Sequence, residues 1–283
     1  MPISPPDHME EFEEKPAEES TDSPEEGYTP DPRGPRPLPA PGEELEEPEE
    51  EEEEDELGPE TPVPKLAVLQ DAMAWAFEGE TVEDGVLDIF ARHALMVLER
   101  NRELNLTAIV EPREVAAKHY LDSWRTCRLI PLFGRRVLDL GSGAGFPGLP
   151  MAVGEDDTRV ILCESRKKKA AFLQEAVDEL GLSNASVVAE RAEDHLNTVE
   201  VDIVVARAIS SVRENVRTLR KVKHRLKDYV MLKGANWSRE VRSGEREAER
   251  LGFHLNTVLE HELPGEMGKR AVLVYRAPGG AGL

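Results

Sequence analysis

The 283-residue chain has little of what marks an exported or membrane-bound protein. Its two cysteines, Cys127 and Cys163, fit no metal-binding spacing and need no oxidising compartment. Its longest apolar runs are strand-sized, well short of a membrane span. The first ten residues have neither a basic start nor an apolar core. We therefore expect a protein that stays in the cytoplasm and has no membrane partner.

Basic residues are almost missing from residues 1–64. This segment holds 24 of the 57 acidic residues but only 3 of the 35 basic ones, together with 15 of the 21 prolines. The net charge of −22 is therefore mainly a property of this segment and does not describe the rest of the chain. Because it has little to bury, we expect residues 1–64 to be disordered. Two roles stay open: a solvated, self-repelling extension, or a competitor of a polyanionic substrate for basic surface.

The remaining residues, roughly 220, are enough for one well-cored domain with an added subdomain. Apolar residues recur at helical spacing over 66–77 and 82–103, and a further helix is expected from Pro112 to Ile130. We assign residues 65–134 to this helical N-terminal subdomain.

From residue 135 onward, short apolar strands alternate with helices. This alternation predicts a doubly wound, mostly parallel sheet of Rossmann-like α/β type in residues 135–277, followed by a flexible end at 278–283. The last two strands are joined by a short loop and should form an antiparallel edge. After the first strand, which begins at Val137, strands are expected at 159–164, 186–189, 202–206, 229–232, 253–259 and 270–276, and helices at 167–180, 213–226 and 237–251.

The stretch from Val137 to Gly148 reads VLDLGSGAGFPG, an apolar strand followed by a glycine loop. Glycines permit positive φ angles and let a ligand approach the backbone closely. Pro147 suits the first turn of a helix, whose start adds a partial positive charge beside the loop. Strand, loop and helix start together predict a ligand that contains adenosine.

Two registers fit this loop. Read from Asp139 it is D-x-G-x-G-x-G, which is typical of S-adenosylmethionine sites. Read from Gly143 it is G-x-G-x-x-G with Glu164 about twenty residues further on, which matches a dinucleotide site. The second register leaves Asp139 and Gly141 without a role, so the loop favours the methyl donor.

In such a sheet, ligands bind at the carboxyl ends of the central strands. Glu164 ends the second strand, where it either accepts hydrogen bonds from ribose hydroxyls or is an ordinary surface glutamate. Ala192 and Glu193 follow the third strand, where they could read the adenine edge or form an exposed turn. Arg207 follows the fourth strand and needs an anionic partner. That partner is either a ligand or a structural salt bridge.

Six segments occur in order along the chain: NLTAI at 105–109, HYLDS at 119–123, VLDLGSGAGFPGLP at 137–150, AED at 192–194, VVARA at 204–208 and LKG at 232–234. Over about residues 66–276, this combination resembles the bacterial 16S ribosomal RNA guanine-N7 methyltransferase family known as glucose-inhibited division protein B. The second strand departs from the family by ending in CES, so that Glu164 stands where an aspartate is usual. The acidic segment is not part of the family pattern either.

The resemblance implies a monomeric enzyme that uses S-adenosylmethionine and no metal to methylate 16S rRNA, either naked or in the assembled 30S subunit. Guanine N7 keeps an in-plane lone pair, so an in-line attack on the methyl group needs no general base. We therefore expect no catalytic residue in the strict sense and a reaction that depends on positioning. The positioning candidates are Arg207, His119 and Lys233. The donor contacts implied by the resemblance are Gly141, Phe146, Ala192, Glu193 and Arg207, to which the strand and loop pattern adds Asp139, Gly143, Gly145 and Glu164.

RNA binding requires basic clusters, and the sequence offers two. One covers residues 166–169 at the start of a helix; the other is expected on the next basic helix and comprises Arg213, Arg217, Arg220, Lys221, Lys223, Arg225 and Lys227. For each of these residues taken singly, a place on an ordinary solvated helix face is the favoured interpretation. Two rival functions also stay open: an NAD-dependent oxidoreductase, and a catalytically silent RNA-binding or ribosome-assembly factor.

Overall fold

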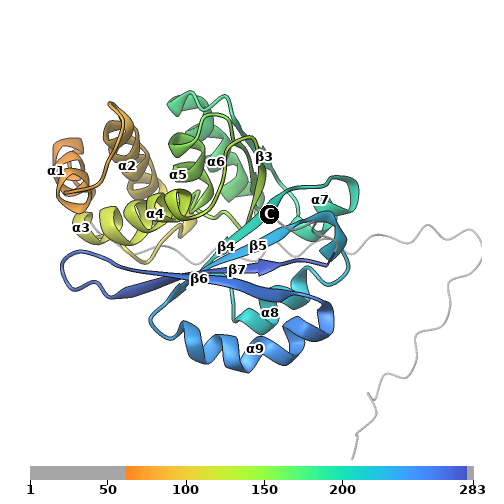
Figure 1. The fold of residues 1–283 in the computed structure, drawn as a ribbon. Helices are drawn as coiled ribbons and strands as arrows, with labels where there is room; N and C mark the ends of the chain where they lie inside the picture. The colour runs from red at the N-terminus through yellow and green to blue at the C-terminus, as the bar shows by residue number, and fades with distance from the viewer. Residues whose placement is uncertain (1–61, 279–283) are drawn as a thin grey trace, which may run out of the picture. The chain divides into compact units, whose positions relative to one another are not determined.

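The computed structural model describes residues 62–278, so residues 1–61 of the segment predicted to be disordered (1–64) and the last five residues lie outside the described part of the chain. Its centre is a seven-stranded sheet in the order β3-β2-β1-β4-β5-β7-β6 (Figure 1). Strands β1 to β5 pair in parallel, whereas β7 pairs antiparallel with both β5 and β6. The strands are β1 Arg136–Leu140, β2 Arg159–Cys163, β3 Ala185–Val188, β4 Ile203–Arg207, β5 Asp228–Gly234, β6 His254–Glu262 and β7 Lys269–Arg276. This arrangement confirms the predicted Rossmann-like fold with an antiparallel edge.

Two apolar cores cover the two faces of the sheet. Helices α1 to α6 lie on one face and α8 and α9 on the other, as Figure 1 shows. Side chains of β1 alternate between the cores: Val137 belongs to the first, and Leu138 and Leu140 belong to the second. The fourth residue of the strand, Asp139, therefore points toward α5. The helices are α1 Leu66–Ala76, α2 Val86–Leu104, α3 Pro112–Val115, α4 Asp122–Leu129, α5 Gly148–Gly154, α6 Lys167–Leu180, α7 Ala192–Thr198, α8 Val212–Thr218 and α9 Trp237–Leu251.

The helical front end shares the first core with the helices of the sheet. Helix α2 packs against α6, and α4 packs against α5. The largest side chains of this region, which include Phe90, Tyr120 and Trp124, are fully buried and contact one another. The division at residue 134 into two subdomains stays a prediction.

The helix predicted from Pro112 to Ile130 is present but is not uniform. Between α3 and α4 the chain forms a π-helical turn, η1, over Ala116–Leu121. Apolar periodicity does not distinguish a π turn from an α turn. π turns occur mostly as single insertions in α-helices and are frequent at functional sites. This turn carries Lys118 and His119, both of which line a cavity at the carboxyl edge of the sheet.

One prediction of secondary structure was wrong, and one helix was not predicted. The helix expected over 213–226 ends at Thr218, after which turns and a short 3₁₀ helix, η2 Lys223–Arg225, lead into β5. Buried Leu219, Val222 and Leu226 continue a helical spacing, but they fill the second core from turns. The missed helix is α7, which opens after β3 at Ala192 and Glu193, where the sequence left open an adenine contact or an exposed turn. The acidic side chains of its first turn suit the positive end of a helix.

Candidate active site

Asp139, near the end of β1, anchors the glycine loop between β1 and α5. Asp139 is fully buried, and its Oδ2 accepts a hydrogen bond of 2.9 Å from the Gly148 N–H. The Ser142 hydroxyl donates to the Asp139 carbonyl at 3.0 Å. Burial raises the pKa of Asp139 to about 7, although the Gly148 N–H opposes this shift. The carboxylate thus ties the loop to the helix start, and a direct contact with the donor stays a prediction.

Residues of the loop have backbone conformations that favour glycine. Gly141, Gly143 and Gly145 have φ angles of 67°, 57° and 99°. At Gly148 the requirement is steric, because an added Cβ would lie 2.5 Å from Leu162 Cδ2. The predicted glycine pattern therefore reflects both backbone conformation and close packing against the sheet.

Glu164 follows β2 and joins it to the loop. Its side chain is buried; Oε2 accepts a hydrogen bond from the Gly143 N–H at 3.0 Å, and Oε1 accepts one from the Arg166 N–H at 2.9 Å. A carboxylate has lone pairs beyond these two bonds. Glu164 is therefore held at the carboxyl edge of the sheet, and its carboxylate could still accept hydrogen bonds from ribose hydroxyls.

The predicted adenine-reading residues lie at the start of α7. Ala192 is buried in the second core, and Glu193 is partly exposed beside it. Both belong to the first helical turn, where backbone N–H groups lack intrahelical acceptors. They follow β3 at the carboxyl edge of the sheet, so their predicted place beside the donor is compatible with the fold.

Phe146 lies at the centre of a group of side chains that the sequence does not bring together. The His119 ring stacks on it, with ring centroids 4.6 Å apart and planes 21° apart. The Arg207 guanidinium carbon lies 5.0 Å from the centre of the same ring. Tyr120 meets it edge-on at 4.9 Å. Two of the predicted positioning residues and one predicted donor contact are therefore neighbours.

Arg207 fixes the protonation state of His119. The Arg207 guanidinium donates to His119 Nδ1 at 2.9 Å and to the Lys118 carbonyl at 2.9 Å. Because arginine has only donors, Nδ1 must be the acceptor, and the proton must be on Nε2. Burial, followed by the charge of Arg207, lowers the pKa of His119 well below its usual value. The ring is therefore neutral at physiological pH.

Thr107 completes this network from the NLTAI segment. Its hydroxyl lies 2.8 Å from His119 Nε2 and accepts that proton. Asn101 holds the Thr107 backbone with two hydrogen bonds of 2.8 Å, one to the carbonyl and one from the N–H. The quoted motif contains Thr107, but its spacing does not assign the hydroxyl to a histidine twelve residues later. The sequence patterns did not identify Asn101 or Lys118 as parts of the site either.

Arg207 has no carboxylate partner within residues 62–278, so the expected alternative of a structural salt bridge is wrong. Its Nε is buried and has no hydrogen-bond acceptor among the described residues. Burial lowers the pKa of Arg207, and the more distant charges of Asp122 and Asp139 oppose this effect. Because Arg207 is only partly buried and lines a cavity, this guanidinium can still donate a hydrogen bond to a ligand.

A cavity of about 580 Å³ opens beside Arg207, within the range of small-ligand sites. It adjoins the glycine loop through Ile209, whose Cδ1 would lie 3.2 Å from a Cβ on Gly141. Ala208, between Arg207 and Ile209, has a φ of 54°, a strained conformation that is common at functional sites. The lining residues are Ile109, Lys118, His119, Asp122, Arg207, Ala208, Ile209, Ser210, Ser211, Leu232, Lys233, Gly234, Glu240 and Arg270.

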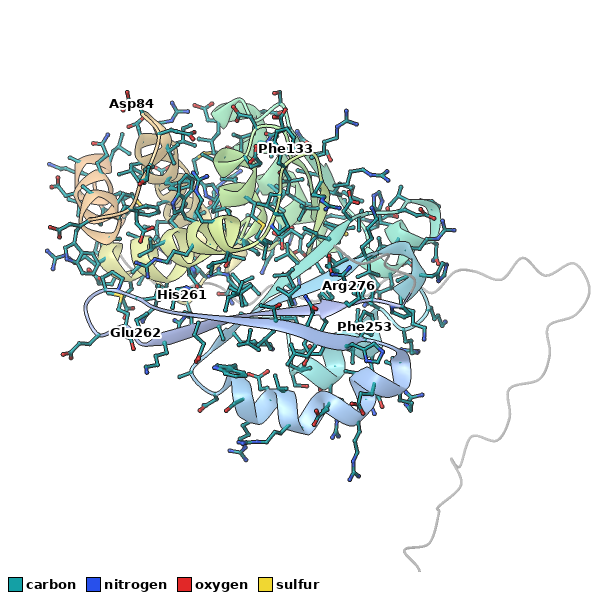
Figure 2. All side chains as sticks on the ribbon, viewed as in Figure 1. Asp84, Phe133, Phe253, His261, Glu262 and Arg276 are labelled. Carbon is teal, nitrogen blue, oxygen red and sulfur yellow. The ribbon has the colours of Figure 1, made fainter. Side chains whose placement is uncertain are left out.

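Charged groups in this cavity are held by neighbours from distant parts of the chain. Asp122 is buried; its Oδ1 lies 2.9 Å from His261 Nε2, and its Oδ2 lies 3.6 Å from Arg270 Nε. His261, labelled in Figure 2, comes from β6. The Lys233 ammonium donates to the Ser210 carbonyl at 2.5 Å and lies 2.8 Å from Glu240 Oε2. His119 and Lys233 thus both line one cavity, and their roles as positioning residues stay predictions.

Comparison with known sequences decides the family. Residues 87–266 match the family described as rRNA small subunit methyltransferase G. A "Ribosomal RNA small subunit methyltransferase G" of Solibacter usitatus is 39% identical over 196 residues, which cover 68% of this chain and 91% of that protein. The protein of the same name from Carboxydothermus hydrogenoformans is 31% identical over 202 residues, covering 70% and 86%. The chain belongs to the rRNA small subunit methyltransferase G family.

Family membership does not support the alternative dinucleotide register of the glycine loop. Among solved structures, a SAM dependent methyltransferase from Aquifex aeolicus is similar at 17% identity with a TM-score of 0.44, covering 58% of this chain and 93% of that one. Within residues 62–278, no helix combines the length and apolar character of a membrane span.

The two predicted basic clusters lie in different places in the fold. Residues 166–169 follow β2 at the ligand edge of the sheet, and their role in RNA binding stays a prediction. The second cluster does not share one helix. Its residues from Lys223 to Lys227 precede β5 and therefore lie at the opposite edge. Several of its side chains also have intramolecular partners: Arg217 with Glu247, Arg225 with Glu200, and Lys227 with Asp202.

Proposed function

We propose that this chain transfers the methyl group of S-adenosylmethionine to N7 of a guanine in 16S ribosomal RNA. Family membership and the names of the relatives support a methyltransferase that acts on small-subunit rRNA. The observation that carries the proposal is the partly buried Arg207 guanidinium, with its buried Nε, between the glycine loop and the cavity. It lacks a carboxylate partner in the described residues, which favours an anionic ligand at this junction.

The residues at the carboxyl edge of the sheet fit the methyl donor. Glu164 would accept hydrogen bonds from ribose hydroxyls, the loop from Gly141 to Gly145 would approach the donor through its backbone, and Ala192 with Glu193 would contact the adenine. Arg207 would contact the donor or the RNA, and Phe146 would pack beside them. When bound, S-adenosylmethionine supplies a methyl group on a positively charged sulfur.

Guanine N7 is a nucleophile that needs no deprotonation, so the chain need not supply a general base. His119 fits this requirement: it is neutral, its Nδ1 accepts a bond from Arg207, and its Nε2 proton is held by Thr107. Neither nitrogen is free to take a proton from a substrate. The residues of the site instead orient the reacting groups and exclude water, and positioning of this kind can contribute about 7–11 kcal/mol.

Enzymes that modify one base of a folded RNA commonly act on a single-stranded base or take the base out of its stack. The cavity is large enough for a nucleotide-sized ligand, and its wall carries the cations Lys118, Arg207, Lys233 and Arg270. Cations of this kind can bind the phosphates that flank a flipped nucleotide.

The test uses the full chain, tritiated S-adenosylmethionine, and either 30S subunits or naked 16S transcript. The proposal expects label in a single guanine, identified as N7-methylguanine by its borohydride- and aniline-sensitive cleavage. Label in another base would contradict the proposal. Subunits that bind the chain without consuming donor would instead favour the silent RNA-binding factor.

A further inference from the structure

One wall of the cavity is formed by an ion pair between the end of β5 and the first turn of α9. The Lys233 side chain is only 7% exposed, and its ammonium lies 2.8 Å from Glu240 Oε2. The ammonium also donates to the Ser210 carbonyl, which belongs to the connection between β4 and α8. Lys233 and Glu240 are thus held side by side in a cavity that adjoins the glycine loop.

This pair keeps hydrogen-bonding capacity. Glu240 Oε2 is buried and, within the described residues, receives no well-directed hydrogen bond, although Lys233 is close. An ammonium has three donors, and Ser210 and Glu240 account for at most two of them. The wall therefore presents a carboxylate acceptor directly beside an N–H donor.

The Watson–Crick edge of guanine has the complementary pattern. O6 accepts a hydrogen bond, and the adjacent N1–H and N2–H₂ groups donate, so an ammonium beside a carboxylate matches all three groups. Adenine presents a donor where guanine has O6 and an acceptor where guanine has N1–H. Enzymes that flip bases commonly read them by hydrogen bonds to this edge.

Resting on the proposed function, we propose that Glu240 and Lys233 bind the Watson–Crick edge of the target guanine and select it against other bases. Glu240 accepts from N1–H and N2–H₂, and Lys233 donates to O6. N7 lies on the other side of O6, on the free edge of the ring. That edge can then face Arg207 and Ile209, which separate the cavity from the glycine loop.

The test replaces the target base. Once the methylated guanine has been mapped, 30S subunits are reconstituted with 16S RNA that carries guanosine or inosine at that nucleotide. Inosine keeps O6 and N1–H but lacks the N2 amino group. We expect the wild-type chain to methylate inosine about tenfold or more slowly in kcat/KM, in line with the discrimination that a two-bond contact to a base provides.

The variant Glu240→Gln should lower kcat/KM for guanosine and bring the two rates within about threefold of each other. The control is Glu249→Gln, an exposed glutamate on the same helix, which should keep the wild-type ratio. Affinity for S-adenosylhomocysteine shows whether the variant is folded.

Two results would overturn the assignment: equal wild-type rates on guanosine and inosine, or a Glu240→Gln variant that slows both substrates equally and keeps their ratio. The comparison of wild-type rates on guanosine and inosine tests recognition of the N2 amino group even if the variant fails to fold. No transfer to guanosine subunits at all would instead contradict the proposed function.

Discussion

Replacing Gly148 by alanine sets helix propensity against packing. Gly148 is the first residue of α5, where alanine would ordinarily stabilise the helix by about 0.5–1 kcal/mol. In this structure the added Cβ would lie 2.5 Å from Leu162 Cδ2 and 2.7 Å from Asp139 Oδ2. Carbon atoms prefer separations of about 3.5–4.0 Å, so the new Cβ would lie about 1–1.5 Å too close to Leu162.

Neither neighbour can move into solvent, because Leu162 and Asp139 are both fully buried. Overpacking of this kind costs about 1–3 kcal/mol. Displacing the helix start also lengthens the hydrogen bond from the Gly148 N–H to Asp139, and a bond to a charged group contributes about 1.5–3 kcal/mol. We therefore expect Gly148→Ala to lower the free energy of unfolding by about 3–5 kcal/mol, a large part of the stability of an ordinary domain.

Urea denaturation followed by circular dichroism at pH 8 measures this loss, and calorimetric titration with S-adenosylhomocysteine measures the effect on the loop. The matched control is Gly234→Ala, where the nearest atom to the new Cβ is Arg270 Nη1 at 3.9 Å and little change is expected. A Gly148→Ala protein as stable as the wild type, or more stable, would refute the packing argument and leave helix propensity as the stronger effect.

Four further outcomes are expected. Arg207→Ala should lower kcat/KM on 30S subunits at least 100-fold, because the variant loses the cation between the two binding regions; wild-type turnover would remove it from the site. Thr107→Val leaves the buried His119 N–H without an acceptor and should cost about 1–3 kcal/mol in urea denaturation, whereas Thr107→Ser should not. Folding raises the pKa of Asp139 to about 7, so the protonated carboxyl stabilises the folded state below pH 4, and this stabilisation is lost as the pH rises to 7. Over that interval the unfolding free energy of the wild type should fall by about 4 kcal/mol relative to that of Asp139→Asn. Deleting residues 1–61 should leave activity and its salt dependence unchanged, and a change in either would favour competition with RNA.

Sequence reasoning succeeded where structure follows from short-range pattern. Alternating apolar strands and helices predicted the sheet, and the glycine spacing located the loop and the start of α5. It failed at α8, where Leu219, Val222 and Leu226 keep a helical spacing although the chain has already turned. Apolar side chains show that spacing because they are buried, and side chains of a turn that packs against the same core can be buried in the same way.

The site could be predicted only in part for a related reason. Arg207 and His119 are 88 positions apart, and their hydrogen bond depends on how η1 packs against the end of β4. No spacing within either motif encodes that contact. At Asp139 the glycine-loop pattern identified the residue correctly. The direction of its carboxylate, toward α5, follows from the alternation of side chains along β1.

The front-end helices complete the site that the glycine loop begins. Phe146 is covered by His93, His119 and Tyr120, all of which precede the first strand. Arg207 receives both of its acceptors from the π-helical turn, since the Lys118 carbonyl and His119 Nδ1 lie there. Without that turn, the guanidinium at the end of β4 would lose both acceptors and one ring face of Phe146 would be bare. The helices at residues 65–134 therefore determine the orientation of Arg207, and changes in them should alter donor or RNA binding even where they contact neither.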